Sequence, residues 1–143
     1  MRGLPQSRKA EALKRAPLFE GLSKKDLLEI ARVTEDLQVP AGTVLCKEGA
    51  IGREFFVIVE GAVEVTRGGE RVATRGAGDF VGEIALLTET RRTATVTATS
   101  PLRCLILMRG DFRRVLDENR AIERKVTTAL AERLAGYIAD PSF

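Results

Sequence analysis

The chain has 143 residues, of which 44% are hydrophobic, so one globular domain with a substantial core is expected. Lys and Arg number 23 against 20 Asp and Glu, a net charge of +3, and histidine is absent. The lack of histidine excludes His-based metal sites and removes the usual general base, so we do not expect an enzyme. No apolar run approaches the roughly 18 residues of a membrane span, and the charged N-terminus does not resemble a secretory signal.

Positive charge is densest in the first fifteen residues, and these side chains are Arg2, Arg8, Lys9, Lys14 and Arg15. They are mixed with acidic and apolar neighbours, which favours a solvated helix face over a nucleic-acid surface. We therefore expect no direct contact with nucleic acid within this chain.

The two cysteines, Cys46 and Cys104, lie in apolar, strand-like stretches and lack the spacing of a CxxC motif. Buried, reduced thiols are the expected state of such residues, and reduced thiols fit a cytoplasmic location.

Helices are predicted at the N-terminal end. A first helix spans 7–15 and ends at Ala16-Pro17, because proline disfavours helix at the preceding residue. A second spans about 24–32, where Ser23 is a suitable N-cap and Asp26 occupies the third helical position.

From Val39 onward, glycines punctuate short apolar runs, a pattern typical of antiparallel β structure. Residues 55–59 are apolar at every position, which predicts a strand covered on both faces. Residues 62–66 alternate between apolar and polar, a tight turn follows at 67–71, and two further strands are expected at 93–99 and 102–108.

The C-terminal part is again helical in its periodicity. Asp111 can cap a helix that ends near Asp117, and a longer helix follows with an apolar stripe. The stripe consists of Ile122, Val126, Ala129, Leu130, Leu134 and Ile138. It can pack on the β structure or pair with a second copy of the chain, and the sequence leaves both open.

The predicted fold is mainly β with flanking α: an antiparallel, jelly-roll-like β-roll with N-terminal helices, one short helix inside the roll and two C-terminal helices. We expect a single domain over 1–143, with a flexible tail at 1–6, N-terminal helices at 7–36, the β-roll at 37–109 and C-terminal helices at 111–139.

The stretch DFVGEIALLTETRRTATVTA, residues 79–98, carries the main functional signal. Two glycines precede a short helix-compatible run, whose first amides, those of Ile84, Ala85 and Leu86, can bind an anion. Arg92 can fork onto phosphate oxygens, whereas Glu83 would repel a phosphate and suits a sugar hydroxyl instead. This combination suggests a ligand with a hydroxyl close to a phosphate; the alternative is a plain salt bridge between Glu83 and Arg92.

The stretch at 81–98 resembles the phosphate-binding cassette of cyclic nucleotide-binding domains. An upstream segment, LCKEGAIGREFFVIVEG at 45–61, resembles the strand–turn–strand motif of the same family, with Gly49, Gly52 and Gly61 in register. The lead-in at 13–31 and the terminal helix pair are also similar. The resemblance therefore covers essentially the whole chain, and it makes the short helix at 83–87 the cassette helix.

The resemblance implies roles for individual residues. Glu83 would bind the ribose 2′-hydroxyl and Arg92 the cyclic phosphate, with backbone amides from Gly82 to Ala85 and of Thr93 completing the anion site. The lining of the base and ribose pocket would come from Leu86, Val96, Val65 and Val72. The resemblance implies cAMP or cGMP as the ligand, and it implies no metal or cofactor.

Two residues depart from the commonest cassette. Arg91 stands where a proline often precedes the phosphate arginine, which places a second cation beside the site, although the register favours Arg92. Thr93 stands where many cAMP binders have alanine. Its hydroxyl can bond phosphate or the exocyclic amine of guanine, so cGMP remains an alternative to the favoured cAMP.

A lid over the base is expected from the last helix. Alignment on LAERLAGYIA makes Tyr137 the candidate, with Arg133 and Leu134 behind it, because an aromatic ring can stack on a purine. The alternative is that Tyr137 is an ordinary residue near the end of the helix.

The sequence therefore predicts a non-enzymatic cyclic-nucleotide sensor that couples binding to movement of its C-terminal helices. Possible partners are a second copy through the last helix and an unidentified effector protein. The competing hypotheses are a β-roll interaction or dimerisation module without ligand, and the effector domain of a larger transcription regulator. Met1 and the short tail after the last helix favour a stand-alone module.

Overall fold

The computed structural model describes the backbone of residues 3–139 and the side chains of 3–135. Three N-terminal helical segments come first: α1 (Gln6–Lys14), η1 (Pro17–Phe19) and α2 (Lys24–Arg32). The strands are β1 (Glu35–Val39), β2 (Val44–Cys46), β3 (Glu54–Glu60), β4 (Ala62–Arg67), β5 (Glu70–Gly76), β6 (Phe80–Val81), β7 (Thr95–Ala98) and β8 (Leu102–Met108). Helix α3 (Glu83–Thr88) lies between β6 and β7, and α4 (Arg109–Glu118) and α5 (Arg120–Ala139) end the chain.

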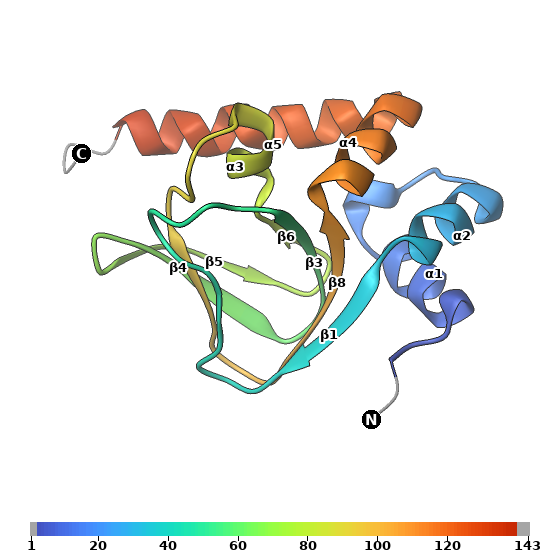
Figure 1. The fold of residues 1–143 in the computed structure, drawn as a ribbon, viewed down its shortest axis with the longest axis horizontal. Coiled ribbons are helices and arrows are strands. Elements are labelled where there is room, and N and C mark those ends of the chain that lie inside the picture. Colours follow the sequence, from blue (N-terminus) through green and yellow to red (C-terminus); the bar gives the residue numbers. More distant parts are fainter. Residues whose placement is uncertain (1–2, 140–143) are drawn as a thin grey trace.

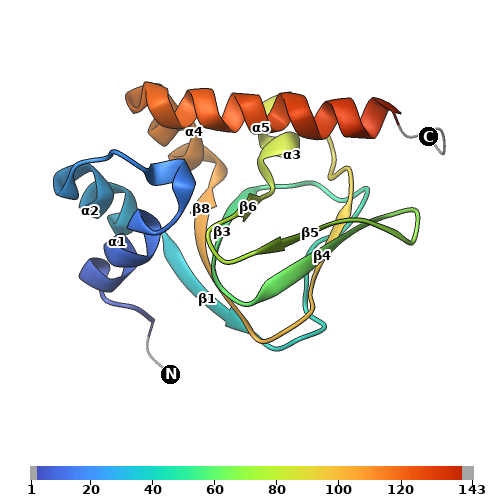
Figure 2. The same cartoon turned by 180° about the vertical axis from the view of Figure 1, so that it is seen from behind.

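The strands form two four-stranded antiparallel sheets, in the orders β1-β8-β3-β6 and β2-β7-β4-β5. Together they make the expected β-roll, with α1 and α2 at one end and α5 running along the top of the roll past α3 (Figures 1 and 2). The fold class predicted from the sequence is confirmed, including the hairpin between β4 and β5.

Strand β3 is covered on both faces, as its unbroken apolar sequence predicts. Phe55 and Val57 belong to a core cluster shared with the helices, whereas Phe56 and Ile58 belong to a second cluster between the sheets. The ring of Phe55 stacks on Phe112 of α4, with 4.4 Å between ring centroids. Helix α4 is thereby anchored to the strand that runs beneath the cassette.

The N-terminal boundaries agree closely with the sequence patterns. Helix α2 has the predicted bounds, and the Asp26 amide donates to the Ser23 hydroxyl at 3.1 Å, the expected N-cap bond. Strand β1 begins at Glu35, earlier than the expected start of the roll at 37. Asp36 accepts a hydrogen bond from the Leu4 amide at 3.0 Å, so the segment expected to be a tail contacts the roll at this point.

The start of α4 differs from the prediction. Asp111 was expected at the cap, but α4 begins at Arg109, with Met108 at the N-cap position. Asp111 lies in the first turn and pairs with Arg114 at 3.2 Å. A carboxylate is favourable anywhere in the first turn of a helix, so the residue type alone did not fix the boundary.

The apolar stripe of α5 packs on the roll over its first turns. Ile122 and Val126 are buried in the helix-facing core, and Ala129 packs against it. Leu130 and Leu134 are half-buried, and the side chain of Ile138 lies outside the described residues. Pairing with a second copy therefore remains a prediction that concerns the later turns. Within residues 3–139, no helix combines the length and apolar character needed to cross a membrane.

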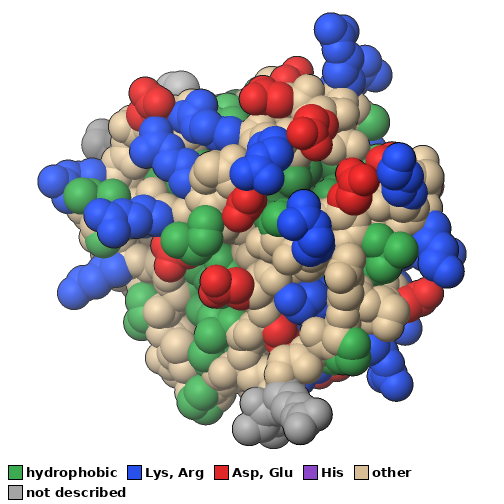
Figure 3. Space-filling view, turned by 45° about the vertical axis from the view of Figure 1, so that its right-hand side comes forward, with side chains coloured by type: hydrophobic (Ala, Val, Ile, Leu, Met, Phe, Trp, Pro, Cys, Tyr) green, Lys and Arg blue, Asp and Glu red, His purple; other side chains and the backbone are tan. Residues whose placement is uncertain are grey.

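Charges of both signs alternate on the face shown in Figure 3, where Lys and Arg side chains stand beside Asp and Glu. A surface of this kind is typical of a solvated protein face and differs from the continuous basic stripe of a nucleic-acid binder.

Candidate ligand-binding site

A cavity of about 700 Å³ opens among strands β4 to β6, the cassette and helix α5. The roll supplies Cys46, Val65, Arg67, Val72, Ala73, Arg75, Asp79, Phe80 and Val81. The cassette and the strand after it supply Gly82, Glu83, Ile84, Arg92, Thr93, Ala94 and Val96, and α5 supplies Ala129, Glu132 and Arg133. A cavity with apolar walls and a few convergent charged groups is the usual form of a small-molecule site.

Arg92 is one of three polar or charged residues that are buried within the described part of the chain, with 6% of its surface exposed. Its guanidinium donates to the backbone oxygen of Gly82 and to that of Glu54, each at 2.9 Å. Glu54 also contributes its carboxylate, 3.8 Å from Arg92. These bonds hold the guanidinium at the cavity wall.

Two motif glycines make room for Arg92. A Cβ atom built on Gly52 would lie 2.5 Å from the Arg92 Nε, and one on Gly82 would lie 3.1 Å from its Nη1 and 2.6 Å from the Glu54 oxygen. Gly82 also has φ 99°, a conformation that favours glycine. Both positions therefore need glycine so that the Arg92 side chain can lie where it does.

Glu83 is 1% exposed and is the first residue of α3. Its two carboxylate oxygens accept hydrogen bonds from one guanidinium nitrogen of Arg133, at 2.7 and 2.6 Å. A carboxylate this deeply buried needs a partner, because an unpaired charge in a protein interior is costly. The last helix supplies that partner.

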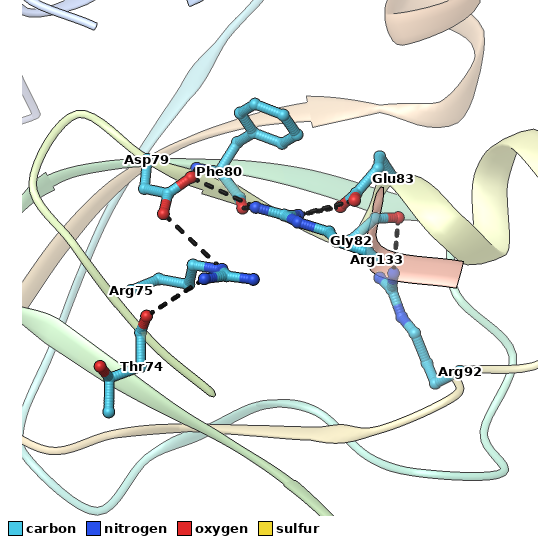
Figure 4. Close-up of polar contacts among 8 residues, drawn as sticks. All are labelled: Thr74, Arg75, Asp79, Phe80, Gly82, Glu83, Arg92 and Arg133. Atoms are coloured by element: carbon cyan, nitrogen blue, oxygen red, sulfur yellow. Dashed lines mark hydrogen bonds and ion pairs between the residues drawn. The ribbon is translucent and has the colours of Figure 1, made fainter. Parts of the chain in front are cut away.

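Arg133 reaches from α5 across the cavity to three residues of the roll (Figure 4). Besides Glu83, it donates to the Asp79 carboxylate at 3.3 Å and to the Phe80 backbone oxygen at 3.0 Å. Its guanidinium carbon also lies 4.6 Å from the centre of the Phe80 ring, within the range of a cation–π contact.

Glu83 and Arg92 do not form an ion pair in the described part of the chain. The carboxylate of Glu83 is bound by Arg133, and Arg92 is bound by Glu54 and Gly82. The alternative of a plain Glu83–Arg92 salt bridge is therefore wrong. The two opposite charges therefore lie at the same cavity while each is bonded to a different set of protein groups.

Most of the predicted site residues line this one cavity: Gly82, Glu83, Ile84, Arg92, Thr93, Val96, Val65 and Val72. Ala85 and Leu86 are buried outside its lining, and Leu86 packs in the helix-facing core. Arg91 is exposed and donates to the Gly49 backbone oxygen at 3.1 Å, outside the lining. The side chain of Tyr137, the candidate lid, lies outside the described residues.

Several lining residues were not predicted from the sequence. Ala73 and Arg75 lie on β5, and Phe80 begins the two-residue strand β6, with Asp79 just before it. They were not singled out because the sequence alone does not show which face of these strands meets the cavity. Arg133 was placed only behind the lid, although it lies one helical turn before Tyr137 and on the same face.

Cys46 is a further lining residue, buried and reduced as expected, and Cys104 is buried in the same core cluster. Burial raises the pKa of the Cys46 thiol to about 11, against a smaller opposing effect of Arg92, and burial raises that of Cys104 to about 12. Both thiols are therefore neutral at physiological pH and contribute apolar surface.

A cavity framed by a β-roll and a cassette helix is the arrangement of a small-molecule-binding domain. The family model for the cyclic nucleotide-binding domain matches residues 36–119, and the chain belongs to that family. Domains of this family are regulatory rather than catalytic.

A curated relative supports the assignment. A cyclic nucleotide-gated potassium channel of Rhizobium etli is 38% identical over 120 residues, which cover 84% of this chain. The match covers 34% of the length of that channel, so the chain corresponds to about a third of it.

Solved structures show the same fold. The regulatory domain of Toxoplasma gondii PKA with cAMP has a TM-score of 0.78 at 24% identity, covering 87% of this chain and 49% of that one. Thermus thermophilus catabolite activator protein has a TM-score of 0.75 at 26% identity, covering 84% and 59%.

Proposed function

We propose that this chain is a cyclic-nucleotide sensor whose preferred ligand is cAMP, with cGMP as the alternative. The observation that carries the proposal is the pair of buried, oppositely charged residues at one cavity, Glu83 and Arg92, each held by other partners. A cyclic nucleotide has a hydroxyl for the first residue and a phosphate for the second.

In the proposed complex, Arg92 binds the cyclic phosphate, together with backbone amides of the cassette between Gly82 and Ala85 and that of Thr93. Glu83 accepts a hydrogen bond from the ribose 2′-hydroxyl. The base then extends toward β4 and β5, where Val65 and Val72 line the cavity. The cavity volume of about 700 Å³ accommodates a molecule of this size.

Coupling to the C-terminal helices would act through Arg133. In the structure this residue bonds to Glu83, the residue that we assign to the ribose. A nucleotide whose 2′-hydroxyl donates to Glu83 competes with Arg133 for that carboxylate, and it thereby alters the preferred position of α5. A ligand shifts such an equilibrium only through contacts that differ between the two states, and Arg133 supplies such a difference.

We propose that an effector protein, or a second copy of the chain, contacts α5 and responds to its change of position. The Rhizobium etli relative is a cyclic nucleotide-gated channel, which suits a domain that transmits ligand binding through its last helix. The cytoplasm, where cyclic nucleotides are found, is the proposed location, and the two reduced cysteines fit it.

Calorimetric titration of the purified protein with cAMP and with cGMP tests the proposal. Nucleotide carried over from expression is removed first by unfolding and refolding, and 5′-AMP serves as the control because it has the same base with an open phosphate. We expect saturable binding of a cyclic nucleotide and much weaker binding of 5′-AMP. No heat with either cyclic nucleotide would leave a β-roll that serves as an interaction module.

Hydrogen exchange with and without the nucleotide tests the coupling separately. We expect the exchange of α5 amides around Arg133 to change on binding, whereas the α2 amides, which lie far from the cavity lining, should keep their rates. An unchanged α5 in a protein that binds nucleotide would contradict the coupling alone.

A further inference from the structure

Glu89 ends the cassette helix in an unusual backbone conformation. It is the C-cap residue of α3, with φ 55° and ψ 35°, and no other non-glycine residue in the described part of the chain has a positive φ. This left-handed conformation is unfavourable for a residue with a Cβ atom, and asparagine and aspartate adopt it more readily than other such residues. A glutamate at this position therefore needs an interaction that compensates for the strain.

The side chain of Glu89 makes such an interaction with helix α4. One carboxylate oxygen, Oε1, accepts hydrogen bonds from Arg109 and from Arg113, each at 3.0 Å. The two arginines lie one turn apart on α4, so their like charges would repel each other without the carboxylate between them. Arg113 also donates to the Leu86 backbone oxygen at 3.2 Å. We call Glu89, Arg109 and Arg113 the Glu89 clamp, and it fastens the C-terminal end of α3 to α4.

In the sequence, the clamp lies between the two parts of the cassette that line the cavity. Gly82, Glu83 and Ile84 line the cavity before Glu89, and Arg92 lines it three residues after Glu89. The Glu89 side chain is exposed and lies outside the lining. The chain therefore turns at Glu89 before it returns to the cavity at Arg92, and this turn sets how the two parts are placed relative to each other.

We propose that Glu89 is a positioning residue of the nucleotide site. Its bonds to α4 hold the turn between α3 and Arg92, and they raise the affinity for a cyclic nucleotide although Glu89 does not contact the ligand. A site that is ordered before the ligand arrives loses less conformational entropy on binding. Without the clamp, part of the binding free energy would go into ordering the turn. The inference rests on the proposed function.

Glu89→Gly separates the clamp from the strain, because glycine adopts the left-handed conformation readily but has no carboxylate. The clamp is exposed, at 65% for Glu89 and 45% for each arginine, so its loss should cost little global stability, and glycine relieves the strain. We therefore expect E89G to unfold in urea at the same denaturant concentration as the unaltered protein or at a higher one. Its affinity for cAMP or cGMP, whichever binds more tightly, should fall by about three- to tenfold, the scale of ordering one or two side chains.

Arg109→Met tests the same contact from α4, and it keeps the proposal testable if E89G does not fold. The Arg109 side chain bonds to Glu89. We expect R109M to weaken nucleotide binding and to add little when it is combined with E89G, since the contact is then already lost. The matched control is Arg114→Met on the same helix, which loses an ion pair with Asp111 and should leave the affinity unchanged.

Hydrogen exchange without nucleotide gives a second readout. The amides at 88–92 should exchange faster in E89G and R109M than in the unaltered protein, and R114M should leave them unchanged. Equal exchange in all variants, or unchanged affinity in both E89G and R109M, would overturn the proposal. A loss of stability in E89G that accompanies the loss of affinity would also overturn it, because Glu89 would then serve the fold alone. Absence of cyclic-nucleotide binding by the unaltered protein would instead overturn the proposed function.

Discussion

Arg133 on α5 binds Glu83 on α3 across 50 residues of sequence, with both carboxylate oxygens within 2.7 Å of one guanidinium nitrogen. The carboxylate is 1% exposed and the arginine side chain 17%, so water screens this pair only weakly. The pair fastens the last helix to the residue that we assign to the ribose. This contact between the last helix and the cavity is the one on which the proposed coupling depends.

Replacing Arg133 by Met should destabilise the ligand-free protein, because Glu83 would remain as a buried charge without a partner. Loss of one member of a buried pair costs about 3–5 kcal/mol, and the partial exposure of Arg133 places this case at or below the lower end. Urea unfolding measures the effect. Adding Glu83→Gln should recover part of the loss, since a neutral amide needs no counter-ion.

Arg124→Met, an exposed change on the same helix, is the control and should have little effect. Strictly additive effects of R133M and E83Q would show that the two side chains do not depend on each other in solution.

The proposed contact between Glu83 and the ribose 2′-hydroxyl can be tested by removing the hydroxyl from the nucleotide and the carboxylate from the protein. The unaltered protein should bind 2′-deoxy-cAMP more weakly than cAMP by about 1.5–3 kcal/mol, the contribution of a hydrogen bond to a charged group. In Glu83→Ala the two nucleotides should bind equally. Calorimetry gives both differences, and a 2′-deoxy penalty that persists in the variant would assign the hydroxyl to another residue.

The neighbouring residues Arg91 and Arg92 can be compared to test which of them binds the phosphate. Arg92→Ala should cost roughly 2–5 kcal/mol of nucleotide binding, because the phosphate would lose a buried charged partner. Arg91→Ala should cost much less, since its side chain is exposed and bonded to Gly49 outside the cavity lining. Calorimetric titration of both variants shows which arginine binds the phosphate. A larger loss of affinity in Arg91→Ala than in Arg92→Ala would assign the phosphate to Arg91.

The sequence predicted those parts of the molecule that local patterns control. The Ser23 cap, the unbroken apolar strand at 55–59 and the cassette helix each follow from neighbouring residues, and each is present. The partner of Glu83 could not be found in this way, because Arg133 is 50 residues away and reaches the site only after α5 packs on the roll. The same holds for Ala73 and Arg75, which reach the cavity lining through the pairing of β5 with β4.

Gly52 gives the last prediction, because its role is visible only in the folded chain. A methyl group at this position would lie 2.5 Å from the Arg92 Nε and 2.6 Å from its Cζ, inside any allowed contact. Arg92 cannot simply step aside, since its two nitrogens are bonded to the Gly82 and Glu54 oxygens. Gly52→Ala should therefore weaken nucleotide binding by an amount comparable with Arg92→Ala while the protein stays folded, as measured by calorimetry and circular dichroism.

Gly76→Ala is the matched control for this change, because a Cβ atom there meets no atom within 4 Å and the backbone has no positive φ. If Gly52→Ala bound nucleotide as the unaltered protein does, the placement of Arg92 described above would not be the placement that binds phosphate. The guanidinium would then have to leave the Gly82 and Glu54 oxygens on binding, and the nucleotide itself would assemble the phosphate site.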